Sequence, residues 1–191
     1  MQKETKRLII RNFQKEDLAD FFEYISNEKV CTMSGAGVCK TIEKANKELK
    51  ERIKKEDFFA IADKNTGKVI GEIYITSHYP LLFSPNKFDY RAAEISFMLS
   101  EKFWGNGFMT EALEEILKYL FKELKVPQVV YSYLDKNKAS ERILEKLNFS
   151  KAQSSRYTRQ WIDGSESLIM ESAMSLEDYN KNIKRRDYEK N

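Results

Sequence analysis

One segment constrains the fold of this chain more than any other: an apolar strand, a loop with two glycines and an amphipathic helix follow one another. The pattern predicts the strand over Ala93–Leu99, the loop around Gly105 and Gly107, and the helix over Met109–Leu124. Because a helix then begins shortly after a strand ends, its free backbone N–H groups and the positive end of its dipole face one point. The segment therefore predicts an anion-binding turn.

The glycines alone do not identify the anion. Gly105 and Gly107 allow unusual dihedrals and let a ligand approach the backbone, but a plain strand-to-helix turn uses glycine for the same reason. A dinucleotide-binding loop would have a third glycine where Thr110 stands, and a Walker loop would continue with Gly-Lys-Ser or Gly-Lys-Thr. Both of these alternatives fit less well.

Short strands and amphipathic helices alternate along the rest of the chain. The spacing of apolar residues predicts these strands: 8–13, 58–62, 69–76, 93–99, 129–134, 149–157 and 167–174. It predicts these helices: 16–25, 42–54 (with Thr41 as N-cap), 109–124 and 138–147. Residues 26–40 are expected to form a loop with short helical turns.

The organisation is that of one domain. No repeat or linker divides the 191 residues, so we expect a single domain over residues 1–175 and a polar helix or tail over 176–191. The long connection 79–90 is unusual for a spacer because it carries three apolar residues, Leu81, Leu82 and Phe83. These side chains are candidates for a lid or a dimer contact.

Composition excludes several classes of function. The 33 basic and 30 acidic residues nearly balance, which argues against a nucleic-acid binder, and no apolar run approaches the ~20 residues of a membrane helix. Cys31 and Cys39 do not amount to a disulfide framework, so we expect a reducing, cytoplasmic setting. His78 is the only histidine and no Cys/His cluster has zinc spacing, so no metal is expected.

Four motifs in order give the chain a family resemblance. They are residues 4–11, the Gly67-x-x-Ile70-Gly71 hairpin, 93–97 with 104–112, and Asn137-x-x-Ser140 with 144–149. In this order and spacing the sequence resembles the GNAT superfamily, and within it the ribosomal-protein-alanine acetyltransferase branch. The similarity covers residues 4 to about 174.

The resemblance implies a fold and a co-substrate. The fold is mixed α/β (α+β): a mostly antiparallel twisted sheet of about 6–7 strands with a splayed central parallel pair, flanked by about 4–5 helices. The co-substrate is acetyl-CoA, without a metal. By resemblance, the residues that bind it are Phe97, Met98, Leu99, Trp104, Gly105, Asn106, Gly107, Phe108, Met109, Thr110 and Asn137.

The sequence departs from the family pattern at three positions. Trp104 and Met109 stand at the two ends of the glycine loop, and Met109 is bulkier than the usual small residue. Asn148 replaces a glycine. Asparagine tolerates a left-handed backbone better than most residues, so we expect only a local substitution there.

The implied reaction is direct attack of an amine on a thioester, which needs a base, an oxyanion donor and an acid. The strand that carries Glu94 makes this carboxylate the first candidate for the base, although it could instead pair with Arg91. Glu72 and His78 are the alternatives. Backbone N–H groups at residues 97–99 are the expected oxyanion donors, as the resemblance implies.

The acid is expected at Ser140, which matches the position of the family's proton donor. Tyr131 and Tyr133 are alternatives, and Asn137 is expected to cap the following helix. Cys31 and Cys39 are not needed as nucleophiles, because the reaction requires no acyl-enzyme.

The acceptor and the assembly are less constrained. The resemblance leaves open a protein N-terminal α-amine or a small-molecule amine as acceptor, and a monomer or a homodimer as the assembly. No nucleic acid or membrane partner is expected. The alternative function is a coenzyme A-binding regulatory or interaction module without catalysis.

Overall fold

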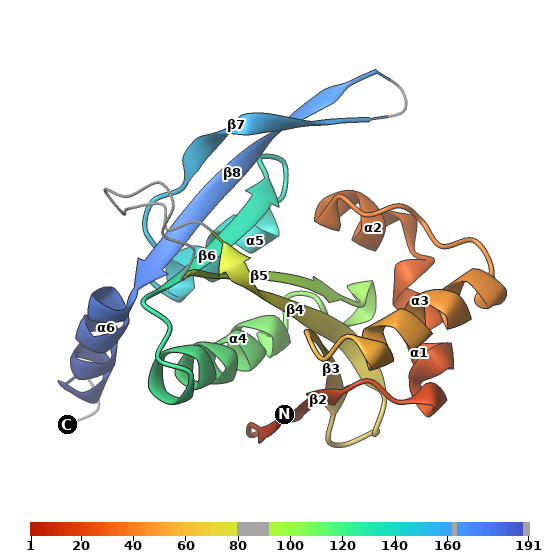
Figure 1. Cartoon of the computed structure of the whole chain (residues 1–191), viewed down its shortest axis with the longest axis horizontal. Coiled ribbons are helices and arrows are strands. Elements are labelled where there is room, and N and C mark those ends of the chain that lie inside the picture. The colour runs from red at the N-terminus through yellow and green to blue at the C-terminus, as the bar shows by residue number, and fades with distance from the viewer. Residues whose placement is uncertain (80–91, 162–163, 189–191) are drawn as a thin grey trace. The chain divides into compact units, whose positions relative to one another are not determined.

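The computed structural model of the protein describes residues 1–79, 92–161 and 164–188 (Figure 1). The chain forms two compact parts. The first part comprises residues 1–75 and 96–115, and the second comprises the described residues of 76–95 and 116–191. The chain passes between the parts within two strands and one helix.

The first part contains four consecutive strands that pair antiparallel in sequence order. The register places Leu8 opposite Asp63 and Phe58 opposite Tyr74, and a β-bulge interrupts the pairing between Ile61 and Ala62. The strands are β1 (Gln2–Glu4), β2 (Leu8–Asn12), β3 (Phe58–Asp63) and β4 (Val69–Tyr79).

Local signals in the sequence set the helix ends of this part. The Asn27 side chain accepts hydrogen bonds from the first backbone N–H groups of α2, and Thr41 Oγ1 accepts one from Lys44 N at 3.3 Å at the start of α3. Gly35 ends α2 in the left-handed conformation, at φ 71°. The helices are η1 (Lys15–Asp17), α1 (Leu18–Ile25), α2 (Glu28–Ser34), α3 (Ile42–Lys54) and η2 (Glu101–Phe103).

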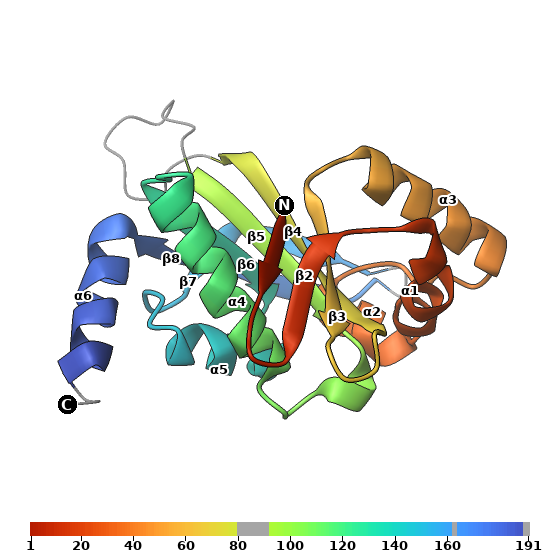
Figure 2. The same cartoon turned by 90° about the horizontal axis from the view of Figure 1, so that it is seen from below.

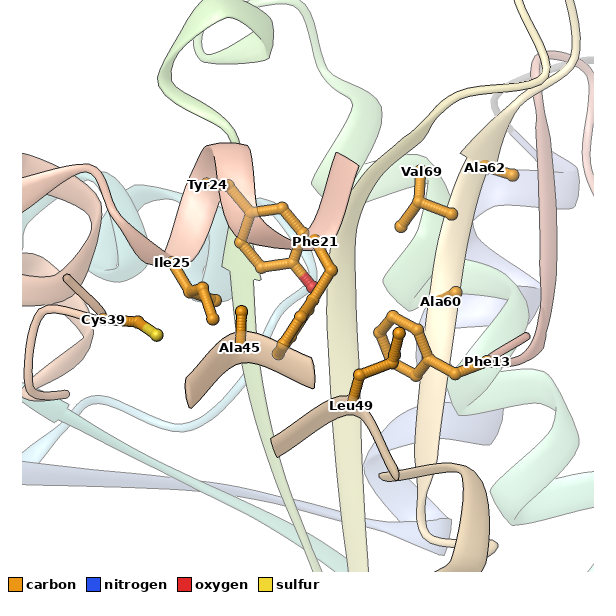
Figure 3. Close-up of a cluster of buried hydrophobic side chains, with 10 residues drawn as sticks. All are labelled: Phe13, Phe21, Tyr24, Ile25, Cys39, Ala45, Leu49, Ala60, Ala62 and Val69. Atoms are coloured by element: carbon orange, nitrogen blue, oxygen red, sulfur yellow. The ribbon is translucent and has the colours of Figure 1, made fainter. Parts of the chain in front are cut away.

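The core of the first part lies where α1 and α3 pack on β3 and β4 (Figure 3). Phe21 is fully buried at its centre, with edge-to-face ring contacts to Phe13 at 5.7 Å and to Tyr24 at 5.5 Å between centroids. Leu49 of α3 points into the same cluster. Burying a side chain of this size contributes about 2 kcal/mol, so this core holds the helices on the sheet.

The second part contains the parallel pair. The first half of β5 (Ala92–Leu99) runs parallel to β6 (Gln128–Leu134), and the ladder joins Ala93–Ile95 to Val129–Tyr131. The next strands pair antiparallel in the order β6, β8 (Glu166–Ser175), β7 (Gln153–Gln160).

Helices complete the second part. After α4 (Phe108–Lys118) the chain makes a π-helical turn over Tyr119–Glu123, and α5 (Lys138–Lys146) and α6 (Leu176–Tyr188) follow later. The ring of Tyr179 in α6 stacks on Phe121 at 4.7 Å between centroids, and Lys122 Nζ donates to Asn180 Oδ1 at 2.6 Å. These contacts attach α6 to the turn that follows α4.

The fold predicted from the sequence is confirmed: α/β elements, mostly antiparallel strand pairs and one parallel pair. Strand β1 was missed, because it lies in a polar segment, and α2 is a seven-residue helix where a loop with short helical turns was predicted. Strand β7 begins at Gln153 and not at 149, whereas Asn148 does adopt a left-handed φ of 60°. The predicted connection 79–90, apart from Tyr79 at the end of β4, lies outside the described residues, as does Asp163 of the last hairpin.

None of the helices in the described ranges is long and apolar enough to cross a membrane.

Candidate active site

The glycine loop of the first part has the backbone conformation that its glycines were expected to permit. Gly105 and Gly107 have φ values of 75° and 76°, and α4 begins at Phe108 directly after them. Trp104 Nε1 donates to the Leu99 carbonyl oxygen at 2.8 Å, and Asn106 Nδ2 donates to the Trp104 carbonyl oxygen at 3.0 Å. The loop is thus folded on itself at the N-terminus of a helix.

The bulky Met109 fits this loop because its side chain is buried, with 3% exposed. The preceding Phe108 packs edge-to-face against Phe103 at 5.7 Å between ring centroids. Glu111 N donates to the Gly107 carbonyl oxygen at 3.0 Å and closes the first helical turn, which also contains Thr110. The departure from the family pattern at position 109 is therefore absorbed by the core.

Arg7 and Glu111, which the sequence did not mark as site residues, meet beside this loop although they are 104 residues apart. Arg7 Nε donates to Glu111 Oε2 at 2.6 Å, and the backbone N–H of Arg7 donates to Oε1 at 2.8 Å. Arg7 Nη1 donates to the Asn106 carbonyl oxygen at 3.0 Å. The signal in the sequence was that both residues lie inside family motifs, Arg7 in the first (4–11) and Glu111 in the third (104–112).

The end of β5 in the first part lies against the backbone of β4. Ser100 N donates to the Ile70 carbonyl oxygen at 2.8 Å, and a Cβ added at Gly71 would overlap the carbonyl oxygen of Met98. The last glycine of the Gly-x-x-Ile-Gly hairpin is therefore required by a close backbone approach. Phe97 and Met98 are half-buried, and Leu99 is buried.

In the second part, the half-buried Glu94 carboxylate meets a serine. Ser132 Oγ of β6 donates to Glu94 Oε1 at 3.1 Å. Burial raises the pKa of Glu94 above its ordinary value, and the negative charge of Glu171 on β8 acts in the same direction, against the Ser132 hydrogen bond. Glu94 therefore has the environment of a carboxylate that can take up a proton.

A buried hydroxyl pair lies between β6 and α5 in the same part. The Tyr131 hydroxyl and Ser140 Oγ are 3.1 Å apart, within hydrogen-bond distance. Asn137 Oδ1 accepts from Ser140 N at 3.1 Å, so Asn137 caps α5 as expected. Burial raises the pKa of Tyr131, which keeps its hydroxyl protonated. Tyr133 stacks on Tyr131 at 6.0 Å between ring centroids.

The alternative base Glu72 is bound by strong hydrogen-bond donors. Its two carboxylate oxygens accept from Arg52 Nε at 2.8 Å and Arg52 Nη2 at 3.1 Å, and the Tyr24 hydroxyl donates at 3.1 Å. The third candidate, His78, lies in β4, but its side chain is outside the described ones, as is Arg91.

The two cysteines are buried and free. Cys31 Sγ donates to the Ile25 carbonyl oxygen at 3.0 Å, and burial raises the pKa of this thiol. A thiol with a raised pKa is a poor nucleophile, which fits the expectation for Cys31. Among the residues that the structure describes, no group of three or more His, Cys, Asp and Glu side chains has the arrangement of a metal site.

The sequence matches a known protein family over most of its length. The family model described as the acetyltransferase (GNAT) domain matches residues 7–150. The chain is a GNAT acetyltransferase. Proteins of this family use acetyl-CoA as their co-substrate.

Relatives of this GNAT protein are found among Bacillus subtilis proteins. It is 28% identical to the uncharacterized N-acetyltransferase YoaA over 153 residues, which cover 78% of this chain and 82% of YoaA. It is 31% identical to the probable N-acetyltransferase YjcK over 137 residues, which cover 69% of this chain and 68% of YjcK.

Solved structures show the same GNAT fold. A GNAT acetyltransferase from Bacillus anthracis has a TM-score of 0.75 at 23% identity, covering 93% of this chain and 99% of that one. The ribosomal-protein-S5-alanine acetyltransferase of Vibrio fischeri has a TM-score of 0.71 at 17% identity, covering 94% and 98%. The spermidine N-acetyltransferase of Vibrio cholerae, solved with CoA and spermine, has a TM-score of 0.71 at 15% identity. The match covers 92% of this chain and 99% of that one.

Proposed function

We propose that this GNAT protein transfers the acetyl group of acetyl-CoA to a primary amine by direct attack on the thioester. The observation that carries the proposal is Glu94, a half-buried carboxylate whose pKa is raised and which accepts one hydrogen bond from Ser132. A carboxylate whose pKa is raised binds a proton more strongly than an ordinary glutamate, and this makes it a stronger general base.

In this mechanism Glu94 takes a proton from the acceptor ammonium, directly or through one water. The neutral amine then forms a bond to the acetyl carbonyl carbon, the carbon–sulfur bond breaks, and the nitrogen releases its second proton to solvent as the amide forms. Backbone N–H groups within residues 97–99 donate to the carbonyl oxygen as negative charge develops on it. Such donors typically lower the barrier by about 3 kcal/mol.

Ser140 gives a proton to the departing thiolate in the same proposal. Its hydroxyl is buried and within hydrogen-bond distance of the Tyr131 hydroxyl, so Tyr131 can replace the proton that Ser140 loses. Asn137 fixes the start of α5, and with it the backbone of Ser140. Tyr133, on the same strand as Tyr131, is the alternative acid.

The pyrophosphate of acetyl-CoA is proposed to bind at the loop from Trp104 to Thr110. Gly105 and Gly107, at positive φ, stand just before the first turn of α4, and the N-terminal backbone N–H groups of a helix suit a phosphate. Under the proposal, Asn137 binds the pantetheine arm.

The acceptor is proposed to be a protein N-terminal α-amine or a small-molecule amine. The names of two fold neighbours, a ribosomal-protein-S5-alanine acetyltransferase and a spermidine N-acetyltransferase, represent these two classes. The proposal also holds that residues 1–175 form one GNAT domain, and that the protein acts in the cytoplasm as a monomer or a homodimer.

The test is release of coenzyme A thiol from acetyl-CoA over a panel of amines and peptides, with Glu94→Gln and Ser140→Ala beside the parent. The parent should turn over at least one acceptor, and both variants should bind CoA but react more slowly. CoA should also raise the melting temperature, because a ligand at 100 times its Kd stabilises by roughly 2.7 kcal/mol. Binding without turnover of any acceptor would favour a non-catalytic coenzyme A-binding module.

A further inference from the structure

Arg7 makes four kinds of contact at the start of α4, all within the first part. Its Nε and backbone N–H donate to the Glu111 carboxylate, and its Nη1 donates to the Asn106 carbonyl oxygen. Its guanidinium lies over the Phe108 ring, with Cζ 4.1 Å from the centroid. Its Nη2 would lie 3.6 Å from a Cβ added at Gly107. One side chain thus touches the loop, the first helical residue and the first helical turn.

The second member of this arrangement is Glu111, which receives three protein donors. Besides the two from Arg7, Thr5 Oγ1 donates to Glu111 Oε1 at 2.5 Å. Burial opposes the charge of Glu111, yet the hydrogen bonds from Thr5 and Arg7 outweigh it and hold the pKa of this carboxyl below its usual range. Thr5 and Arg7 lie in the turn between β1 and β2, beside which α4 begins (Figure 2). The turn is therefore attached to the helix by a charged pair.

The placement of Arg7 is electrostatically unusual for a purely structural contact. A cation near a helix N-terminus opposes the helix dipole, and Glu111 in the first turn offsets this. Simple attachment of the β1–β2 turn to α4 would be achieved by Thr5 and Glu111 without any guanidinium. The guanidinium adds two contacts that Thr5 does not make, one to the Phe108 ring and one to the carbonyl oxygen of Asn106, which stands between the two glycines.

We propose that Arg7 is a positioning residue for the pyrophosphate of acetyl-CoA, because it holds the Asn106 carbonyl and the first turn of α4 in the conformation that presents the loop N–H groups. This inference rests on the proposed function of the loop. Two glycines give a loop high conformational entropy when it is unrestrained. A loop that is already ordered binds more tightly, since less ordering accompanies binding.

The experiment distinguishes binding of the pyrophosphate of acetyl-CoA from reaction at its thioester. Titration calorimetry gives the Kd of CoA for the parent, Arg7→Ala and Arg7→Lys. Turnover with the best acceptor then gives kcat/KM for acetyl-CoA and for S-acetylpantetheine, which has the same thioester and no pyrophosphate. Arg7→Ala should weaken CoA binding roughly tenfold and lower kcat/KM for acetyl-CoA roughly tenfold, mainly through KM. It should leave kcat/KM for S-acetylpantetheine unchanged.

Arg7→Lys and Lys6→Ala serve as matched variants. A lysine keeps the charge, but its single ammonium group cannot reproduce the planar guanidinium that bonds Glu111 and Asn106 at the same time. Arg7→Lys should therefore recover only part of the CoA affinity that Arg7→Ala loses. Lys6 is exposed in the same turn, and Lys6→Ala removes one positive charge without these contacts, so it should change the Kd of CoA less than twofold.

The outcomes distinguish this inference from the proposed function. If the parent does not bind CoA, the proposed function of the loop fails, and this inference with it. If the parent binds CoA and Arg7→Ala binds equally well, only the role of Arg7 is overturned. An equal loss with both donors, at a temperature well below the melting point of the variant, would show that Arg7 is merely structural and would also overturn the inference.

Discussion

Two glutamates, Glu72 in the first part and Glu94 in the second, differ in what surrounds their carboxylates. Glu72 is 3% exposed and accepts hydrogen bonds from two guanidinium nitrogens of Arg52 and from the Tyr24 hydroxyl. Glu94 is half-buried and accepts one from the Ser132 hydroxyl, and the charge of Glu171 raises its pKa further. One carboxylate has a cationic partner, and the other has a neutral donor and a negative neighbour.

The difference teaches that burial alone does not identify a general base. A carboxylate in a bidentate pair with arginine already has both oxygens engaged by charged donors, as Glu72 has with Arg52. Burial beside a weak donor and a like charge disfavours the charged form, which makes the carboxylate a better base. On this ground we propose Glu94, and not Glu72, as the base.

The largest expected effect is on catalysis. Glu94→Gln keeps the shape of the side chain but removes the group that accepts the proton, so kcat/KM should fall roughly a thousandfold, equivalent to about 4 kcal/mol. Steady-state kinetics with a saturating acceptor measures this. Glu72→Gln is the matched control and should stay within about threefold of the parent per folded molecule. If the two variants lost equal activity, the distinction between the two glutamates would collapse.

The second effect is on stability and concerns Glu72. Glu72→Ala would leave the buried Arg52 guanidinium without its main partner, and the free energy of unfolding should fall by about 3 kcal/mol. Urea denaturation measures the change. The double variant Arg52→Met with Glu72→Leu should recover much of the loss, because it leaves no unpaired buried charge. A single variant as stable as the parent would show that the pair contributes nothing.

The smallest effect is a displacement of the pH profile. Because Glu94 must be deprotonated to act, its raised pKa should move the acid limb of kcat/KM to higher pH than for an ordinary glutamate. Ser132→Ala removes the hydrogen bond that favours the charged form, so the acid limb should move to still higher pH. Glu171→Gln removes a like charge, so the limb should move to lower pH. If the acid limbs of Ser132→Ala and Glu171→Gln moved in the same direction, or did not move, Glu94 would not be the base.

Sequence patterns predicted most of the fold because its signals are local. Thr41 and Asn137 cap helices by bonding backbone groups three residues away, and the apolar spacing located most strands within a few residues. Strand β1 and the bounds of α2 lack such a local spacing. Strand β1 is held by pairing with β2, and the start of α2 is capped by the Asn27 side chain, which accepts from Lys29 N and Val30 N.

The candidate site was predictable in part for the same reason. Glu94, Ser140 and the glycine loop were predicted as site residues through the family resemblance, which rests on the order of motifs along the chain. The partners of these residues were not: Ser132 lies 38 residues from Glu94, and Glu111 lies 104 from Arg7. Nothing in the sequence around Glu72 indicated that Arg52 and Tyr24 would bind it.

The sequence by itself determined most strands and helices to within a few residues, and that Gly105, Gly107 and Asn148 would accept positive φ, because these properties depend on a residue and its near neighbours. Only the tertiary structure decided which of the two glutamates pairs with an arginine and which cation bonds to the glycine loop. The reason is that a charge or a pKa depends on the groups that folding brings within a few ångströms, whatever their separation along the chain.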